Sequence, residues 1–399
     1  MTYTAKGLPR YFIFILIFSL GACRTEPNQA SSPQASLISH ENVNIDDAIT
    51  DFIDSNHLPG LVLIVKHKGE IVKHQAYGYA NIEKKVPMSK DAIFRLFSMT
   101  KAITSVVTLE TLKRHNMTVD EPIQNVLPSF SNVPDMPIHT LLNHTSGLSY
   151  GFKINRWAGW LYLFANLGAS STLDEFIAKL SDLPLLSEPG ARWRYSYSSD
   201  VLGAAIEKLN NESLTASFNK LVFSPLTMKD TGFYLSNDAA PRLVPMYTNA
   251  WFSEFPKQVD LESNITQVPT AHSGGGGLFS TAADYMKFVD FLLSESPSHS
   301  SLDSKMASKI TKDQLPAGIE KLPPRLYNKS SFGYGVGVKL ENDGRMSPGS
   351  FFWAGKGGTT FWADPQQELA VVAMMQMEGG RKQLEDNLIP LVYQWIKSL

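Results

Sequence analysis

Strand-like sequence stands at both ends of this chain, and helical sequence fills the middle. Near the N-terminus, residues 61–65 and 71–78 are rich in apolar and β-branched side chains and are separated by a Lys-Gly turn. The C-terminal third has the same character in "FGYGVGVKL", "SFFWAGKGGTTFWAD" and "ELAVVAMMQM". Strands at both ends of a helical middle indicate one sheet that is built from both chain ends.

The spacing of these runs predicts the class of fold. Hairpin-like spacing at each end favours an antiparallel sheet, formed from about 58–80 and 331–378. Between them, residues 98–295 are mostly helical in period, and the last 17 residues return to helical spacing. We therefore predict an α+β fold, in which helices flank the sheet and a mostly helical region is inserted. A doubly wound α/β sheet would alternate strand and helix throughout, which this chain does not do.

One helix start is marked clearly inside the helical region. Thr281 is followed three residues later by Asp284, which together form a capping box ahead of an apolar stripe. The pattern predicts a helix over 281–294.

The first 42 residues are expected to lie outside the fold, which then covers 43–399. Lys6 and Arg10 precede a short apolar run and then "GAC", as in a signal peptide over 1–22. The apolar run is shorter than the roughly 20 residues that a membrane span needs. Polar residues with Pro, Ser and Gln follow over 23–42 and are typical of a flexible tether.

"LGAC" resembles a bacterial lipobox, so Cys23 is expected to carry a lipid. It is the single cysteine of the chain, which also excludes an intramolecular disulfide. Arg24 after it resembles an outer-membrane lipoprotein that faces the periplasm. Ordinary secretion with an incidental cysteine is the alternative.

The bulk composition excludes several classes of partner. A net charge of −2 over 399 residues gives no sign of nucleic-acid binding. The nine histidines form no ligand-spaced pair with carboxylates, and no H-E-x-x-H is present. No glycine-rich phosphate loop follows a strand. We therefore expect neither a metal nor any other cofactor.

Two serines compete for the role of a nucleophile. Ser149 stands in "GLSYG", which matches the G-x-S-x-G of α/β-hydrolases, but helical rather than strand spacing precedes it. Ser98 stands in "SMTK", ahead of an apolar helical run. On a helix, Ser98 and Lys101 share a face, and a buried amine there can serve as a base toward the hydroxyl. S-x-x-K alone also arises by chance.

Tyr195 is a third candidate for the same site. It follows a Pro-Gly turn and precedes a helix-like run in "PGARWRYSYSSDVLG". A tyrosine beside a lysine and a serine could relay a proton and protonate a leaving group. A structural role is the alternative, because most tyrosines serve only packing.

Six segments together resemble the serine β-lactamase-related family, which includes class C β-lactamases, DD-peptidases and family VIII carboxylesterases. They follow the family order over residues 45–399: "FRLFSMTK", "MTVDEPIQNVLP", "LLNHTSGL", "PGARWRYSYSSDVLG", "GGGGLFSTAADYMKF" and "WAGKGGTTFWADP". The resemblance implies Ser98 as the nucleophile, Lys101 as its base partner and Tyr195 as the second general base. It also implies the α+β architecture predicted above, and it makes "GLSYG" incidental.

Two motifs depart from the β-lactamase pattern and resemble the family VIII carboxylesterases instead. The family's Lys-Thr-Gly, whose lysine helps to hold a substrate carboxylate, is replaced by a segment that starts at Trp353. Its Tyr-x-Asn is replaced by a segment that ends at Tyr197. Gly355 and Lys356 still suit an edge strand whose backbone N–H would complete an oxyanion hole with that of Ser98.

Two further segments have open interpretations. Residues 156–168 are very apolar, which suits either a buried helix or a hydrophobic lid over an acyl pocket. The glycines of 272–280 suit either close approach to a ligand or a plain loop before the capped helix.

We therefore expect an exported, lipid-anchored serine hydrolase that forms an acyl-enzyme on Ser98. Its expected substrates are small-molecule esters, because no cation stands at position 353 to hold a carboxylate. A DD-peptidase, D-aminopeptidase or weak β-lactamase, which act on amide-like bonds, is the first alternative. A non-catalytic lipoprotein that binds cell-wall fragments is the second.

Overall fold

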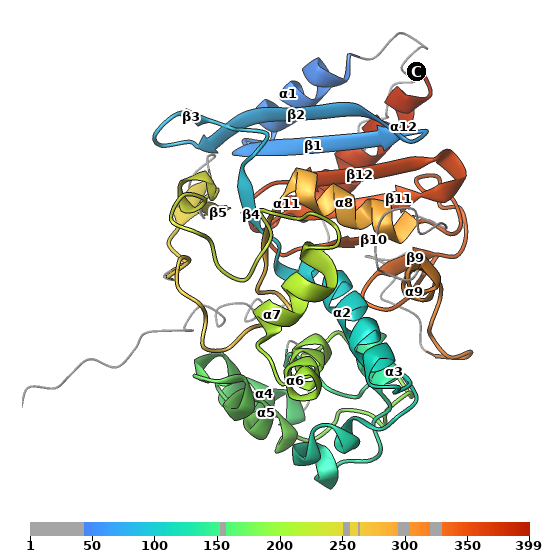
Figure 1. The fold of residues 1–399 in the computed structure, drawn as a ribbon. Helices are drawn as coiled ribbons and strands as arrows, with labels where there is room; N and C mark the ends of the chain where they lie inside the picture. Colours follow the sequence, from blue (N-terminus) through green and yellow to red (C-terminus); the bar gives the residue numbers. More distant parts are fainter. Residues whose placement is uncertain (1–43, 152–156, 250–255, 262–263, 294–303, 320–328) are drawn as a thin grey trace, which may run out of the picture.

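The computed structural model describes residues 44–151, 157–249, 256–261, 264–293, 304–319 and 329–399. An antiparallel sheet crosses the upper half of the molecule, and helices cover both its faces (Figure 1). Its strand order is β3-β2-β1-β12-β11-β10-β9-β8. The strands are β1 (Gly60–His67), β2 (Glu70–Asn81), β3 (Val86–Pro87), β8 (Ser330–Phe332), β9 (Gly337–Lys339), β10 (Phe351–Ala354), β11 (Thr359–Asp364) and β12 (Leu369–Met374).

The sheet joins the two ends of the chain at its centre. β1 pairs with β12 along most of its length, from Val62 opposite Met374 to His67 opposite Leu369. All six residues of β11 and of β12 are buried, as expected of strands that are covered on both faces. The predicted α+β fold, with a sheet built from both chain ends, is therefore confirmed.

Alternating side chains of β1 serve two separate cores. Leu61, Leu63 and Val65 pack on one face of the sheet, among residues of the first and last helices. Val62 and Ile64 point to the other face, which the helical region covers. The first face is covered by α1 (Ile45–Ser55) and α12 (Ile389–Ile396), and α1 lies at the top of Figure 1; the short α11 (Gly380–Gln383) precedes α12.

The other face is covered by α8 (Ala282–Leu293), which begins as the sequence predicted. The N–H of Asp284 donates to the hydroxyl of Thr281 at 3.2 Å, which caps the helix start. A short ladder of β4 (Ile93–Arg95) with β7 (Phe279–Thr281) leads into this helix. A second short ladder pairs β5 (Met246–Thr248) with β6 (Lys257–Val259).

The helical region surrounds one central helix, α2 (Thr100–Arg114). Every residue from Thr100 to Leu112 is buried, so α2 has no solvent face over most of its length. Its packing partners include α6 (Ser198–Asn210), and they bury its polar residues as well as its apolar ones. The other helices are α3 (Ile138–Leu142), α4 (Trp157–Phe164), α5 (Leu173–Ser181), α7 (Leu214–Phe218) and α9 (Ser304–Thr311).

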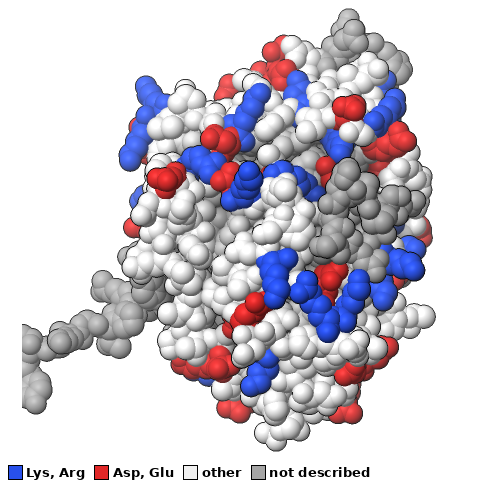
Figure 2. Space-filling view, in the orientation of Figure 1, with Lys and Arg blue, Asp and Glu red and all other residues white. Residues whose placement is uncertain are grey.

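The exterior carries both signs of charge. In Figure 2, Lys and Arg side chains are interspersed with Asp and Glu over the face that is shown, in keeping with the net charge of −2. Within the described ranges, no helix has the length and apolar character to cross a bilayer. The expected signal peptide and tether, with Cys23, lie outside the described residues.

Candidate active site

Ser98 lies at the junction between the sheet side and the helical region. It is the middle residue of a single 3-10 turn, Phe97–Met99, that leads directly into α2. The N–H of Leu96 donates to the carbonyl of Leu278 at 2.8 Å, which fixes the approach to this turn. Phe97 has a φ of 47°, a conformation that costs a bulky residue free energy and that concentrates at functional sites. The half-buried hydroxyl of Ser98 is thus presented on a constrained turn.

Lys101, one turn into the same helical path, faces Ser98. Its side chain is 1% exposed, and Nζ lies 3.3 Å from Ser98 Oγ. Nζ also donates to the carbonyl of Gly275 at 2.5 Å. The spacing of three residues therefore places the two side chains together, as the sequence predicted. Their catalytic roles stay predictions.

Tyr195 lies on the segment that leads into α6, beside Lys101. Lys101 Nζ is 4.8 Å from the centre of the Tyr195 ring. The phenolic oxygen of Tyr195 is buried and has no hydrogen-bond partner among the described residues. Because buried hydroxyls are nearly always paired, this oxygen can accept or donate a hydrogen bond during a reaction. The three residues expected to act together are thus brought together.

The "GLSYG" segment contributes a different residue from the one its pattern suggests. The hydroxyl of Ser149 is buried and accepts the N–H of Gly151 at 3.0 Å, a local turn contact. Tyr150 instead reaches the site, with its ring 5.6 Å from Lys101 Nζ and 4.3 Å from the Tyr197 ring. Burial raises the pKa of Tyr150, and burial raises that of Tyr197 to about 12. Sequence reasoning missed Tyr150.

The glycine segment packs on helices. The hydroxyl of Thr104 donates to the carbonyl of Gly274 at 2.6 Å, and a Cβ on Gly274 would stand 2.4 Å from the carbonyl oxygen of Ser199. The glycines thus let one turn fit between α2 and α6, where the Gly275 carbonyl meets Lys101. Asp200 of α6 completes this contact by accepting the N–H of Gly275 at 3.0 Å. Burial raises the pKa of Asp200, and the nearby charge of Lys101 partly opposes that rise.

His144 is a second buried residue that the sequence did not single out. Its ring lies 4.8 Å from that of Tyr195, and Nδ1 is 3.4 Å from the hydroxyl of Ser196. Ser196 in turn shares a hydrogen bond with Ser198. Burial, together with the charge of Lys101, lowers the pKa of His144 well below its usual value of 6.5. The imidazole of His144 is therefore neutral, and it packs against the ring of Tyr195.

Trp353 lies at the end of β10, next to Tyr195. Its side chain is 2% exposed, and its ring is 5.6 Å from that of Tyr195 and 5.0 Å from that of Phe332. Trp353 thus shapes the site by packing behind Tyr195. β10 is an interior strand, so the expectation of an edge strand is wrong for the sheet as a whole. Its pairing with β9 ends at Phe352, however, which leaves Trp353 beyond the ladder on that side.

The two residues that follow β10 differ in what their backbone can offer. The N–H of Gly355 donates to the carbonyl of Thr359 at 2.7 Å inside the hairpin, so it is not a spare donor. The side chain of Lys356 is 62% exposed, and its Nζ lies 2.9 Å from Glu378 Oε1. Of the two expected oxyanion donors, Lys356 therefore remains the candidate.

The apolar segment at 156–168 combines features of both its interpretations. Residues 152–156 lie outside the described residues, and α4 starts at Trp157. Tyr162 is buried and its hydroxyl donates to the carbonyl of Pro184 at 3.2 Å, whereas Phe164 is 76% exposed. A Cβ on Gly151 would stand 3.0 Å from Tyr162 Cβ, so α4 packs next to the Tyr150 segment. α4 is thus a packed helix with an apolar outer face.

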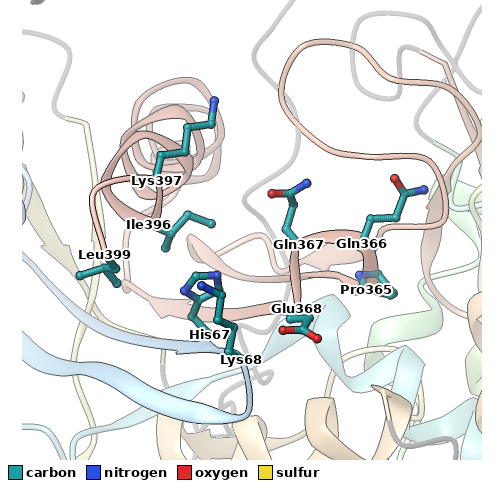
Figure 3. A pocket seen from close by; sticks show the side chains of 9 residues that line it. All are labelled: His67, Lys68, Pro365, Gln366, Gln367, Glu368, Ile396, Lys397 and Leu399. Atoms are coloured by element: carbon teal, nitrogen blue, oxygen red, sulfur yellow. The ribbon is translucent and has the colours of Figure 1, made fainter. Parts of the chain in front are cut away.

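A pocket of about 460 Å³ lies elsewhere in the molecule, near the C-terminal helix (Figure 3). Its lining includes His67, Glu368 and Lys397. The strand register places His67 and Leu369 at the end of the sheet opposite to Trp353, so this pocket is separate from Ser98. The described ranges hold no cluster of three or more His, Cys, Asp or Glu that could bind a metal ion.

Comparison with known proteins agrees with this geometry. A model of the Beta-lactamase family matches residues 45–392. The chain belongs to the Beta-lactamase family. Esterase EstB of Burkholderia gladioli is 30% identical to this member over 88% of this chain and 94% of the esterase. Penicillin-binding protein 4* of Bacillus subtilis is 25% identical over 72% of this chain and 61% of that protein.

The solved structure of EstCE1, titled a hydrolase with promiscuous acyltransferase activity, has the same fold. It superposes with a TM-score of 0.77 at 25% identity, over 88% of this chain and 97% of EstCE1. The predicted family resemblance is therefore confirmed, and this Beta-lactamase family member is a serine hydrolase.

Proposed function

We propose that this chain is a carboxylesterase that acts through an acyl-enzyme on Ser98. The observation that carries the proposal is the pairing of Lys101 Nζ with Ser98 Oγ at 3.3 Å. The hydroxyl of Tyr195, which has no hydrogen-bond partner within the described ranges, lies beside this pair. Ser98 Oγ attacks the ester carbonyl while its proton passes to the Lys101–Tyr195 pair. The tetrahedral oxyanion is held by the backbone N–H groups of Ser98 and Lys356.

The ester bond then breaks. Tyr195 returns the proton to the departing alkoxide, which leaves as an alcohol, and the acyl group stays on Ser98. A water molecule attacks this acyl-enzyme and gives up a proton to the same pair. The pair returns that proton to Ser98 Oγ as the acyl C–O bond breaks, so the carboxylic acid leaves and the hydroxyl of Ser98 is restored. Each of the two steps uses the same oxyanion donors.

The surroundings of Ser98 favour uncharged esters over substrates that carry a carboxylate. Trp353 stands where the family pattern has a lysine, and its side chain is buried against Tyr195. The side chain of Lys356, three residues further along the chain, forms a salt bridge with Glu378 on the surface. A substrate carboxylate would then lose its hydration without gaining a partner at this position. Similarity to esterase EstB supports the same choice.

Similarity to penicillin-binding protein 4* favours one second candidate, a hydrolase of peptide-like amides or β-lactams. Amides demand more of the same groups, because an amine leaves less readily than an alcohol.

The deciding experiment compares three substrate classes on purified protein: short-chain aryl esters, D-amino-acid amides and a chromogenic cephalosporin. We expect ester hydrolysis to exceed the other two by orders of magnitude, and a fluorophosphonate probe to label the protein once. Preference for the cephalosporin or for the amides would replace the esterase proposal with the second candidate. A protein that shows neither labelling nor turnover would contradict the acyl-enzyme on Ser98.

We also propose that the chain is exported and anchored to the cell envelope by a lipid on Cys23, with the outer membrane as its location. The support is the "LGAC" sequence after a short apolar run, and Arg24 after the cysteine.

A further inference from the structure

The turn at Gly274 and Gly275 contacts the amine of Lys101, which extends from α2. Gly275 gives its carbonyl to Lys101 Nζ, and Gly274 gives its carbonyl to Thr104, one turn along α2. These carbonyls belong to a turn between two elements, so no helix or strand fixes their direction. The orientation of these two carbonyls therefore depends on the contacts that hold the turn in place.

Asp200, in the first turn of α6, holds the glycine turn by two hydrogen bonds. Its Oδ1 accepts the N–H of Gly275 at 3.0 Å and the hydroxyl of Ser273 at 2.6 Å. A Cβ on Gly275 would stand 2.5 Å from Oδ2, so the carboxylate lies directly against this glycine. The residue whose N–H is held by Asp200 is therefore the residue whose carbonyl meets Lys101.

The carboxylate also acts through its charge. Asp200 is buried, and the charge of Lys101 acts on it in this enclosed setting, where water screens little. The other titratable groups that line this part of the site are Tyr150, Tyr195, Tyr197 and His144. Burial favours the neutral forms of Tyr150, Tyr197 and His144, so Asp200 is the carboxylate that faces Lys101 among these groups.

We propose that Asp200 is a positioning residue for Lys101, which aims the Gly275 carbonyl at the amine and favours its protonated form. Asp200 thereby sets the pH at which Ser98 becomes reactive. The inference rests on the proposed function, since it takes Ser98 and Lys101 as the acylating pair. Sequence order does not suggest it, because three distant segments meet here.

The test measures the rate of fluorophosphonate labelling against pH, together with kcat and KM for an aryl ester. Asp200→Asn keeps the shape and the acceptor oxygen but removes the charge, so proton loss from the amine becomes easier. We expect the midpoint of the acid limb to move down by about one pH unit. Ser273→Ala removes a donor that stabilises the ionised carboxylate, so Asp200 carries less negative charge and the midpoint moves down by a smaller amount. Both changes act on kcat more than on KM.

Asp364→Asn is the matched control, because Asp364 is also a buried carboxylate that accepts several hydrogen bonds, but at the far end of the sheet. It should lower the melting temperature and leave the midpoint in place. If Asp200→Asn does not fold, the Ser273→Ala midpoint decides alone.

An unmoved midpoint in the folded Asp200 and Ser273 variants, with a wild-type chain that labels normally, overturns this inference and leaves the proposed function standing. A wild-type chain that neither labels nor hydrolyses esters overturns both.

Discussion

Lys101 Nζ and Ser98 Oγ lie 3.3 Å apart at the start of α2, on one turn of a helix that is buried on all sides. Lys101 is 1% exposed, and its amine donates to the carbonyl of Gly275 as well as facing Ser98. This pair therefore supplies the sharpest test of the mechanism.

Replacing Ser98 by Ala should abolish fluorophosphonate labelling and nearly all ester hydrolysis, because the other groups act through that hydroxyl. Ser149→Ala is the matched control: its hydroxyl only closes a local turn with Gly151, so most activity should survive. Labelling intensity and initial rates on an aryl ester measure both variants. If Ser149 proves essential and Ser98 dispensable, the assignment of the nucleophile is wrong.

A methyl group on Gly275 should disturb both stability and reactivity. Its Cβ would stand 2.5 Å from Asp200 Oδ2, so the carboxylate or the turn must move. We expect Gly275→Ala to lower the free energy of unfolding by about 1–3 kcal/mol and to slow labelling of Ser98. Gly276→Ala is the neighbouring control, because its Cβ would meet Phe97 at an ordinary 3.7 Å. Urea unfolding of both variants measures the difference, and equal losses would contradict the close contact.

The stability of the protein should fall on mild acidification because of His144. The folded protein holds the pKa of His144 well below 6.5, mainly by burial. The unfolded chain regains the ordinary value of about 6.5 and therefore binds a proton that the folded state refuses. The free energy of unfolding then decreases as pH falls below about 6.5, by up to about 1.4 kcal/mol per pH unit from this residue, until the folded-state pKa is reached.

His144→Asn should flatten that dependence, and Asn suits the positive φ of 60° at this position. His67 and His74 have pKa values lowered by burial too, so some slope will remain. The exposed His57, changed to Gln, should leave the wild-type slope intact. Thermal unfolding at pH 5 to 8 measures all three proteins, and a slope unchanged in His144→Asn would show that other groups cause it.

Trp353→Lys should change the ratio of substrates rather than add activity. A lysine there offers a partner to a substrate carboxylate but loses the packing against Tyr195. We expect ester turnover to fall and the ratio of cephalosporin to ester hydrolysis to rise. Trp353→Phe keeps an aromatic ring and should keep the ester preference. A ratio that stays constant in Trp353→Lys would remove position 353 from the explanation of specificity.

Cys23→Ser should release the protein from the membrane fraction, since the proposed lipid has no other thiol to attach to. Cell fractionation and immunoblotting compare it with the wild-type chain, which should sediment with membranes. A variant that still sediments would place the anchor elsewhere.

The fold could be predicted because its signal is local. The continuous apolar run of β1 and the Thr281 cap of α8 are signals that each lie within a few residues of sequence. The Ser98–Lys101 pair is equally local, since three residues separate its members.

The rest of the site depends on contacts between distant segments, which one sequence does not reveal. Asp200 meets Gly275, and His144 meets Tyr195, only after the helical region has packed. The G-x-S-x-G pattern pointed to Ser149, so sequence reasoning overlooked the adjacent Tyr150. The edge strand expected at Gly355 and Lys356 was wrong because β8 and β9, of three residues each, add two strands beyond β10.

The pairing of β1 with β12 has a consequence for how the chain reaches its folded state. During synthesis, the β1–β2 hairpin emerges early, yet the partner of Val62 is Met374, near the end of the chain. Until then one edge of β1 presents unpaired backbone groups that can recruit another chain. Closing a contact between such distant residues is slow. The arrival of the last strand should therefore limit the folding rate, and chains that stop short of β12 should aggregate.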